Sequence, residues 1–370
     1  MEFKIERNSF AESLGWIQTV VEKKSTMPIL SHALLEAEGS RLTLSTTDLE
    51  VAAYDQIRAE VTKPGKIAVP ARQLYDIVKE LPDSVIHLKK LENNWIQIKC
   101  AKSQYKLVGL DGNEFPKKLE ANNGAEIQLD VKTVLEMLDK TAFAVSADEA
   151  RYNLNGIFWE TLTEGGKNTL RMVATDGHRL SIVDRALEKK ATLSKGVIVP
   201  KKGVGELRRL LNDQEENFRM VLDEKHVRVD FGNKTLVMRL IDGQFPQYNQ
   251  VIPKKLGKVA TLDKNSLTQA LRRISVVTNN RTRGVKFSIS PGNMEISTHN
   301  ADLGEAKEEL AAQYKGPAFE IGFNAQYFLD ALSVIEDESV VFQLGDEVSP
   351  CLIQSEKDKN FTHVIMPMRL

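Results

Sequence analysis

The segment Thr175-Asp176-Gly177-His178-Arg179 contains the residues best spaced for chemistry. Asp176 and His178 are two positions apart, so they could form an acid–base pair in a hydrolase or supply two metal ligands. Asp-Gly is also a common turn pair, and a turn explains the same spacing without catalysis. The chain contains no HExxH, GxSxG, Walker A or GxGxxG sequence. We therefore expect no catalytic residue, metal or cofactor, and keep a hydrolase using Asp176 and His178 as the alternative.

The composition excludes several classes of protein. The 370 residues include 50 Lys+Arg and 51 Asp+Glu, a net charge of −1, whereas a nucleic-acid binder is usually basic. Any DNA contact therefore requires the charges to be segregated onto different surfaces. Cys100 and Cys351 have neither disulfide-framework nor metal-ligand spacing, which favours a reducing cytoplasm. No apolar run approaches the ~20 residues needed to span a bilayer, and the charged start is unlike a signal peptide.

Three copies of one plan recur along the chain. Val69-Pro70-Ala71, Val199-Pro200-Lys201 and Gly322-Phe323-Asn324 each precede an apolar stripe at helical spacing, with steps of 130 and 123 residues between their last positions. A second marker, Asp111-Gly112-Asn113-Glu114-Phe115-Pro116, matches Asp242-Gly243-Gln244-Phe245-Pro246, 130 residues further on. We interpret these matches as an internal repeat.

Each copy also opens with a longer amphipathic helix and continues in strands of period two. The three predicted helical stripes are Phe10, Leu14, Ile17 and Val21; Val134, Leu135, Leu138 and Ala142; and Leu267, Ala270, Leu271 and Ile274. Runs of successive strands favour antiparallel sheets, so the predicted class is α+β. Polar segments with helix breakers near 121–126 and 253–258 predict three domains, at 1–123, 127–252 and 257–370.

Two further features leave alternatives open. Basic residues recur on equivalent predicted helices, where they form either an ordinary solvated face or, if the helices share one side, a summed positive field. The C-terminus, Val364–Leu370, ends on apolar residues, although chain ends are usually polar. Such a tail is either tucked into a core or part of a docking groove, which flexible methionines would suit.

Five motifs carry a resemblance that covers the whole chain in order. They are Arg151-Tyr152-Asn153-Leu154-Asn155-Gly156, Ala174-Thr175-Asp176-Gly177-His178-Arg179-Leu180, Asp242-Gly243-Gln244-Phe245-Pro246, Ile321-Gly322-Phe323-Asn324 and Met366-Pro367-Met368-Arg369-Leu370. Together they resemble the bacterial DNA polymerase III beta subunit family. The resemblance implies three repeated clamp domains per chain, with sheets outside, helices lining a central pore, and a ring closed by head-to-tail dimerisation.

The same resemblance implies a non-catalytic sliding clamp that encircles double-stranded DNA without reading its sequence. Expected partners are a second copy of the chain, the DNA polymerase III alpha subunit, the clamp loader, and other polymerases and repair proteins with short linear motifs, with no membrane. For the dimer joint we expect Tyr105 and Leu107 on one side, and Ile274 and Val277 on the other.

Two sets of contact residues follow from the matching motifs. The expected partner-peptide groove between the second and third domains comprises Arg151, Leu154, Thr175, Gly177, His178, Arg179, Leu180, Pro246, Val251, Asn324, Tyr327, Val348, Met366, Pro367, Met368, Arg369 and Leu370. The expected DNA contacts are Lys24, Arg72, Lys132, Arg151, Tyr152, Lys201, Lys202, Arg208, Arg209 and Arg272. The sequence departs from some relatives at three positions. Gln250 and Asn153 put DNA or rim contacts at those positions in doubt. Thr282 makes one end of the groove shallower or more polar.

Overall fold

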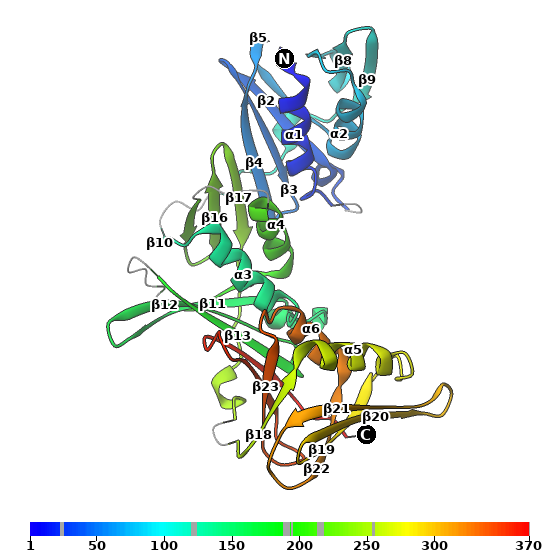
Figure 1. Cartoon of the computed structure of the whole chain (residues 1–370). Coiled ribbons are helices and arrows are strands. Elements are labelled where there is room, and N and C mark those ends of the chain that lie inside the picture. The colour runs from blue at the N-terminus through cyan, green and yellow to red at the C-terminus, as the bar shows by residue number, and fades with distance from the viewer. Residues whose placement is uncertain are drawn as a thin grey trace. The chain divides into compact units, whose positions relative to one another are not determined.

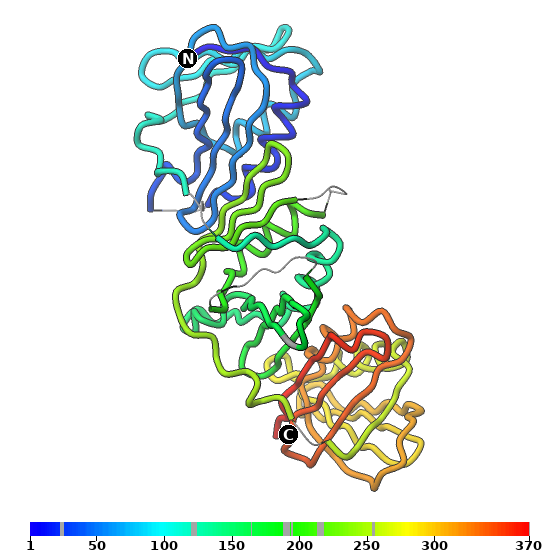
Figure 2. Tube along the Cα trace, turned by 90° about the vertical axis from the view of Figure 1, so that its left-hand side faces the viewer, coloured from blue at the N-terminus to red at the C-terminus, as the bar shows by residue number. Residues whose placement is uncertain are grey.

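The computed structural model describes residues 1–22, 26–119, 124–187, 193, 195–212, 218–253 and 256–369. The chain forms two compact units. Unit 1 consists of Met1–Val131, Ala191–Leu193 and Lys202–Ile241, and unit 2 of Lys132–Lys190, Ser194–Lys201 and Asp242–Leu370. Figure 2 follows the trace through both units.

Unit 1 contains two antiparallel sheets. The five-stranded sheet has the order β5-β1-β7-β8-β9. Its strands are β1 (Glu2–Glu6), β5 (Glu60–Lys63), β7 (Val85–Lys90), β8 (Trp95–Cys100) and β9 (Ser103–Val108). Phe3, Ile86, Leu88, Ile96 and Ile98 are fully buried on one face, so alternate residues of these strands point to the other face.

The second sheet of unit 1 has eight strands in the order β10-β15-β16-β17-β4-β3-β2-β6. The strands are β2 (His32–Glu38), β3 (Arg41–Thr47), β4 (Val51–Arg58), β6 (Gly65–Pro70), β10 (Ala125–Ile127), β15 (Arg219–Leu222), β16 (His226–Phe231) and β17 (Lys234–Arg239). The pairing of β17 with β4, in register at Leu236 and Ala53, joins strands far apart in sequence into one sheet.

Apolar stripes at helical spacing form the helices of unit 1. α1 (Arg7–Ile17) buries Phe10, Leu14 and Ile17 and packs against α2 (Ala71–Glu80), as Figure 1 shows. α4 (Lys201–Asn212) buries Val204, Leu207, Leu210 and Leu211, in agreement with the predicted stripe. Short 3-10 turns connect the elements at η1 (Pro28–Ser31), η2 (Glu92–Asn94) and η3 (Gly112–Glu114).

Unit 2 contains a twelve-stranded antiparallel arrangement in the order β14-β11-β12-β13-β25-β24-β23-β18-β21-β20-β19-β22. The first strands are β11 (Gly156–Glu164), β12 (Lys167–Thr175), β13 (Arg179–Ala186), β14 (Val197–Pro200), β18 (Lys258–Asp263) and β19 (Gly284–Ser290). The others are β20 (Asn293–Asn300), β21 (Gly304–Gln313), β22 (Phe319–Asn324), β23 (Ser339–Leu344), β24 (Cys351–Ser355) and β25 (Phe361–Ile365).

The helices of unit 2 are α3 (Val131–Ala142), α5 (Lys264–Ser275) and α6 (Ala325–Ser333). The 3-10 turns η4 (Glu149–Leu154) and η5 (Tyr248–Gln250) complete it. The Asp263 side chain accepts a hydrogen bond from the Ser266 N–H and so caps the N-terminus of α5. None of the helices in the described part of the chain is long and apolar enough to cross a membrane.

The strand orders reveal the repeat directly. Four strands follow one order three times, as β6-β2-β3-β4, β14-β11-β12-β13 and β22-β19-β20-β21. In the first two copies the last strand pairs with a strand from further along the chain, β4 with β17 and β13 with β25. In the third copy, the last strand, β21, pairs with β20 on one side. On its other side, the described pairing is limited to Ala312 and Gln313, which pair with β18. Residues 304–311 of β21 therefore present an open edge, and β9 ends the five-stranded sheet with another.

Candidate functional site

The Thr175–Arg179 turn lies in unit 2 between β12 and β13 and is held by its own side chains. The Asp176 carboxylate accepts hydrogen bonds from the His178 N–H at 2.9 Å and from the Arg179 N–H at 3.0 Å. The Thr175 hydroxyl donates to the Arg179 carbonyl at 2.6 Å and accepts from the Gly177 N–H at 3.0 Å. Gly177 has a φ of 89°, a conformation that favours glycine. These contacts explain the spacing of the motif as a turn.

This geometry argues against the hydrolase alternative. The second carboxylate oxygen of Asp176 accepts from Arg179 Nε at 3.0 Å, so both oxygens are engaged within the turn. Asp176 contacts the backbone of His178, and the recorded hydrogen bonds do not join it to the imidazole. No group of three or more His, Cys, Asp or Glu side chains that could hold a metal occurs among the residues described.

Arg179 fixes this turn against α6. Its side chain is 10% exposed, and its guanidinium forms ion pairs with Asp176 and Asp330 and donates to the Phe143 carbonyl. It also lies over the Tyr327 ring, 4.6 Å from the centroid. Burial, followed in size by the charge of Asp176, raises the pKa of the Tyr327 phenol. Because these contacts use its donors, the Arg179 guanidinium is held in one position at the edge of the site.

The C-terminal segment runs along the same turn. The Met366 N–H donates to the His178 carbonyl, and the Met368 N–H donates to the Gly322 carbonyl, both at 2.9 Å. Met366, Pro367 and Met368 are half-buried and Arg369 is exposed, while Leu370 lies outside the described residues. The tail is thus neither sunk in a core nor free, because its backbone is fixed while its side chains keep accessible surface.

Most other expected groove residues lie in unit 2 near this segment. Arg151 Nη1 lies 2.9 Å from the position that a Cβ on Gly177 would occupy. Leu180 is buried with Val173, Leu352 and Val364 in one apolar cluster, against which Ile252 packs.

Five further groove residues differ in their surroundings. Asn324 caps α6 through the Gln326 N–H at 2.9 Å. Val251 and Pro246 are exposed beside the buried Tyr248, and Leu154 is buried. Val348, 72% exposed, lies in a turn closed by Asp346, and no recorded contact links it to the others.

The expected DNA contacts differ in exposure and in pairing, and Arg151 and Arg209 are both exposed and ion-paired. Lys132, Tyr152, Lys201, Arg208, Arg209 and Arg272 are exposed, as is much of Arg151. Lys202 forms an ion pair with Asp48, Arg209 one with Glu206 at 3.0 Å, and Arg72 is half-buried. Lys24 lies outside the described residues.

One expected interface residue requires correction. Ile274 is 1% exposed within the chain, because it belongs to the buried stripe of α5 and has almost no surface to offer a partner. Val276, just beyond the helix, is 78% exposed and has the surface that Ile274 lacks. Its spacing off the stripe Leu267, Ala270, Leu271 and Ile274 could have identified it. On the other side, Tyr105 is 41% exposed and Leu107 is half-buried on the open edge of β9.

The residues that support Arg179 were also missed. Phe143 and Asp330 lie 36 and 151 positions from Arg179 in sequence. No local pattern connects them, so only the folded structure places them together.

Repeated domains that join sheet edge to sheet edge, and a hydrogen-bonded turn beside an accessible tail, define a clamp-type binding protein. Three family models match consecutive parts of the chain: the N-terminal, central and C-terminal domains of the DNA polymerase III beta subunit, at residues 1–120, 128–247 and 249–369. The chain belongs to the DNA polymerase III beta subunit family. As a member of it, the protein is a DNA sliding clamp of replication and not an enzyme.

Individual relatives match over their full length. The beta sliding clamp of Caulobacter vibrioides (strain NA1000 / CB15N) is 38% identical over 372 residues, and that of Pseudomonas putida 36% over 371 residues, each covering all of both chains. The solved Caulobacter crescentus pol III beta is 38% identical with a TM-score of 0.95, again over all of both chains. A sliding clamp from Bartonella birtlesii, solved bound to griselimycin, is 36% identical with a TM-score of 0.94 and the same full coverage. The family resemblance and the α+β class with three clamp domains are confirmed.

Proposed function

We propose that two copies of this chain close head to tail into a ring that encircles double-stranded DNA and tethers the replicative polymerase. The observation that carries this proposal is that β9 and β21 are open edges at the positions where the other copies of the repeat pair strand with strand. Within the chain, the last strand of the four-strand order pairs with a strand from further along the chain in two copies, β4 with β17 and β13 with β25. A third joint of the same kind would unite β21 of one protomer with β9 of its partner.

The surfaces beside these edges are complementary. Near the β9 edge, Tyr105 and Lys102 are exposed. On β21, Glu305 and Glu309 are exposed, although Glu309 also pairs with Lys307 at 3.2 Å, and Val276 is exposed at the end of α5. Open edges invite pairing with another strand, and opposite charges select the partner edge. A contact between different patches is heterologous, and with three repeated domains in each of two chains it closes a six-domain ring. We place the domains at 1–123, 127–252 and 257–370.

The contacts between such a ring and DNA can each be weak. The exposed basic residues lie on or next to helices of the second and third repeats, at Lys132, Lys201, Arg208 and Arg272, and near Arg151 and Tyr152. Phosphate contacts are independent of sequence and permit sliding. A closed ring cannot leave a circular duplex without opening, so a protein of net charge −1 can hold DNA topologically.

The groove around Arg179 would receive the partners. In this proposal the buried cluster of Leu180, Leu352 and Val364 would underlie the groove, and Arg151, His178 and the Met366–Arg369 backbone would border it. An apolar slot with a few fixed polar groups suits a short extended peptide. We assign to it the polymerase III alpha subunit, the clamp loader, and other polymerases and repair proteins. Tethering raises the effective concentration of a polymerase at the primer end.

We place the protein in the cytoplasm. Cys100 and Cys351 are both buried and unpaired, which fits a reducing compartment.

Processive synthesis tests the function. On a primed circular single-stranded template, the cognate replicative polymerase and loader should make much longer products when this protein is present. A chain truncated before Met366 should remain dimeric yet fail to lengthen them, whereas Lys225→Gln, which removes an exposed charge from the β15–β16 turn, should behave like the unmodified chain. Products of unchanged length with the intact protein would refute the proposal.

A further inference from the structure

The outer face of the five-stranded sheet of unit 1 carries a regular array of basic residues. Ile96 and Ile98 are fully buried, so Trp95, Gln97 and Lys99 point to the opposite, outer face. The strand register places Lys89, Gln97 and Lys106 side by side across β7, β8 and β9. The next row along consists of His87, Lys99 and Gln104.

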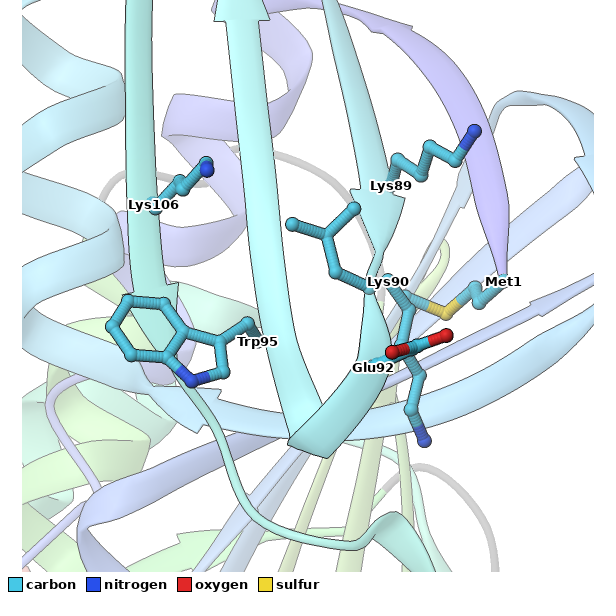
Figure 3. Close-up of a pocket in the computed structure, with 7 residues that line it drawn as sticks. Met1, Lys89, Lys90, Glu92, Trp95 and Lys106 are labelled. Atoms are coloured by element: carbon cyan, nitrogen blue, oxygen red, sulfur yellow. The ribbon is translucent and has the colours of Figure 1, made fainter.

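A hollow of about 960 Å³ lies at one end of this array. It is lined by Met1, Lys89, Lys90, Leu91, Glu92, Trp95 and Lys106. In Figure 3, Trp95 and Lys106 lie on one side of the hollow, and Met1, Lys89 and Glu92 on the other. Trp95 is 40% exposed, whereas large aromatic side chains are usually well covered.

The electrostatics of the hollow favour an anion. Three lysines and the Met1 ammonium line it against one carboxylate, that of Glu92, although Lys89 also lies 3.5 Å from the Glu2 carboxylate. The pKa of the Met1 amino group is lowered, first by burial and then by the positive charges of Lys90 and Lys63. These ammonium groups are close enough to raise one another's energy, which an arriving phosphate would relieve.

The exposed indole narrows the choice of anion. An aromatic ring on an open sheet face stacks on a base, and neighbouring lysines neutralise the backbone of the same strand. Lys89 and Lys106 lie two strands apart in one row, about 9.6 Å across the sheet, and Lys99 lies in the next row, about 6.8 Å along the strands. Long lysine side chains at these spacings can contact several phosphates of one strand. In a duplex the base faces are already stacked, so the ring has no partner there. An acidic peptide or a lipid surface would use the lysines but not the flat face of Trp95.

We propose that this outer sheet face binds single-stranded nucleic acid, with one base stacked on Trp95 and phosphates held by Lys106 and Lys89. The site lies wholly within unit 1 and needs neither the ring nor the peptide groove. It would hold an unpaired strand on a surface separate from any duplex-binding helices.

The test is binding of a fluorescently labelled 12-nucleotide oligo-dT to the full chain, followed by anisotropy, alongside the tryptophan emission of the protein. Oligo-dT should quench the emission of the unmodified chain more than that of Trp95→Ala, because Trp95 is exposed whereas Trp16 is half-buried and Trp159 is fully buried. Trp95→Ala should weaken binding at least about fivefold, and Trp95→Phe less, since a ring remains. Lys106→Gln should reduce the slope of log affinity against log salt by about 0.7.

Controls distinguish binding at this site from nonspecific attraction by positive charge and from a role of Trp95 in the dimer joint. Lys225→Gln removes an exposed charge elsewhere in unit 1 and should change neither affinity nor slope. Unchanged oligo-dT binding by Trp95→Ala, or equal binding of a blunt 12-base-pair duplex, would overturn the proposal. A Trp95→Ala chain that loses self-association but keeps its oligo-dT affinity would also overturn it, by assigning Trp95 to the joint. Failure here leaves duplex retention by the ring unaffected, so the two proposals can be distinguished.

Discussion

Leu49 and Gly177 occupy the same position in two copies of one turn. In the first copy, Asp48 accepts hydrogen bonds from the N–H groups of Glu50 at 2.9 Å and Val51 at 2.6 Å, as Asp176 does from His178 and Arg179. Leu49 has a φ of 79° and Gly177 a φ of 89°. The first copy therefore carries strain that a glycine avoids in the second.

This comparison predicts substitutions of opposite sign. Leu49→Gly should raise the free energy of unfolding by about 1 kcal/mol, because it relieves the left-handed strain and Leu49 is already 42% exposed. Gly177→Ala should lower it by about 1–2 kcal/mol, since its Cβ would also displace the Arg151 guanidinium. Urea denaturation of the two variants measures both. A lower free energy of unfolding for Leu49→Gly would show that packing of the Leu49 side chain stabilises the fold by more than the backbone strain destabilises it.

His363 makes stability depend on pH. It is fully buried on β25, and its two ring nitrogens have no hydrogen-bond partner in the structure. Burial, and then the charge of Arg179, lowers its pKa from 6.5 to about 3. The unfolded chain therefore binds a proton that the folded chain refuses, so stability is full above pH 6.5 and falls as the pH drops below it.

The expected loss from His363 is about 2 kcal/mol between pH 6.5 and pH 5. His363→Phe should flatten this part of the profile of urea midpoint against pH, while replacement of the exposed His299 by Asn should not. Glu136 and Asp358, whose pKa values are lowered, titrate in a separate window below about 4.5. A His363→Phe profile identical to that of the unmodified chain would contradict this assignment.

At the scale of elements, a four-residue ion network connects α3, β13 and the turn before β25. Lys140, 8% exposed, forms ion pairs with Glu136 and Asp358, and Arg185 forms ion pairs with the same two carboxylates. The four positions are far apart in sequence except for Glu136 and Lys140. The network therefore secures the helix to both strands.

Lys140→Ala should lower the free energy of unfolding by about 2–3 kcal/mol, because it leaves two poorly exposed carboxylates with one cation. Lys286→Ala breaks an exposed pair with Glu320 and should have no measurable effect. Thermal unfolding of both variants provides the comparison. Equal effects would mean that the network is an ordinary surface pair.

The elements show which features a sequence can predict. The stripe Leu267, Ala270, Leu271 and Ile274 is buried as its helical period predicts, because one face of a helix must leave water. The same rule predicts that Ile274 has no surface to offer a partner, whereas Val276, off the stripe, is exposed. The contacts of Arg179 with Phe143 and Asp330, like those of Lys140 with Asp358, depend on strand pairing over long distances and have no local pattern. The basic outer face of β7–β9 needs the register, which sequence alone does not give.

At the scale of the whole molecule, the repeat predicts how variant chains combine. Tyr105→Asp should break the β9 side of the joint and Val276→Asp the other side, so each alone should be monomeric. An equimolar mixture should form a dimer with one intact joint, because a head-to-tail contact uses different patches on the two protomers. Analytical ultracentrifugation distinguishes these species. A mixture that stays monomeric would indicate a symmetric contact instead.

The central claim is that the protein stays on DNA because a closed ring surrounds the duplex, and not because its contacts with the DNA are strong. Its most direct measurement is the half-life of the loaded protein on a nicked circular duplex, before and after one cut that makes the DNA linear. The protein should stay on the circle and slide off the cut molecule within the dead time of the assay, at equal salt and DNA length. Equal half-lives on the two would contradict encirclement.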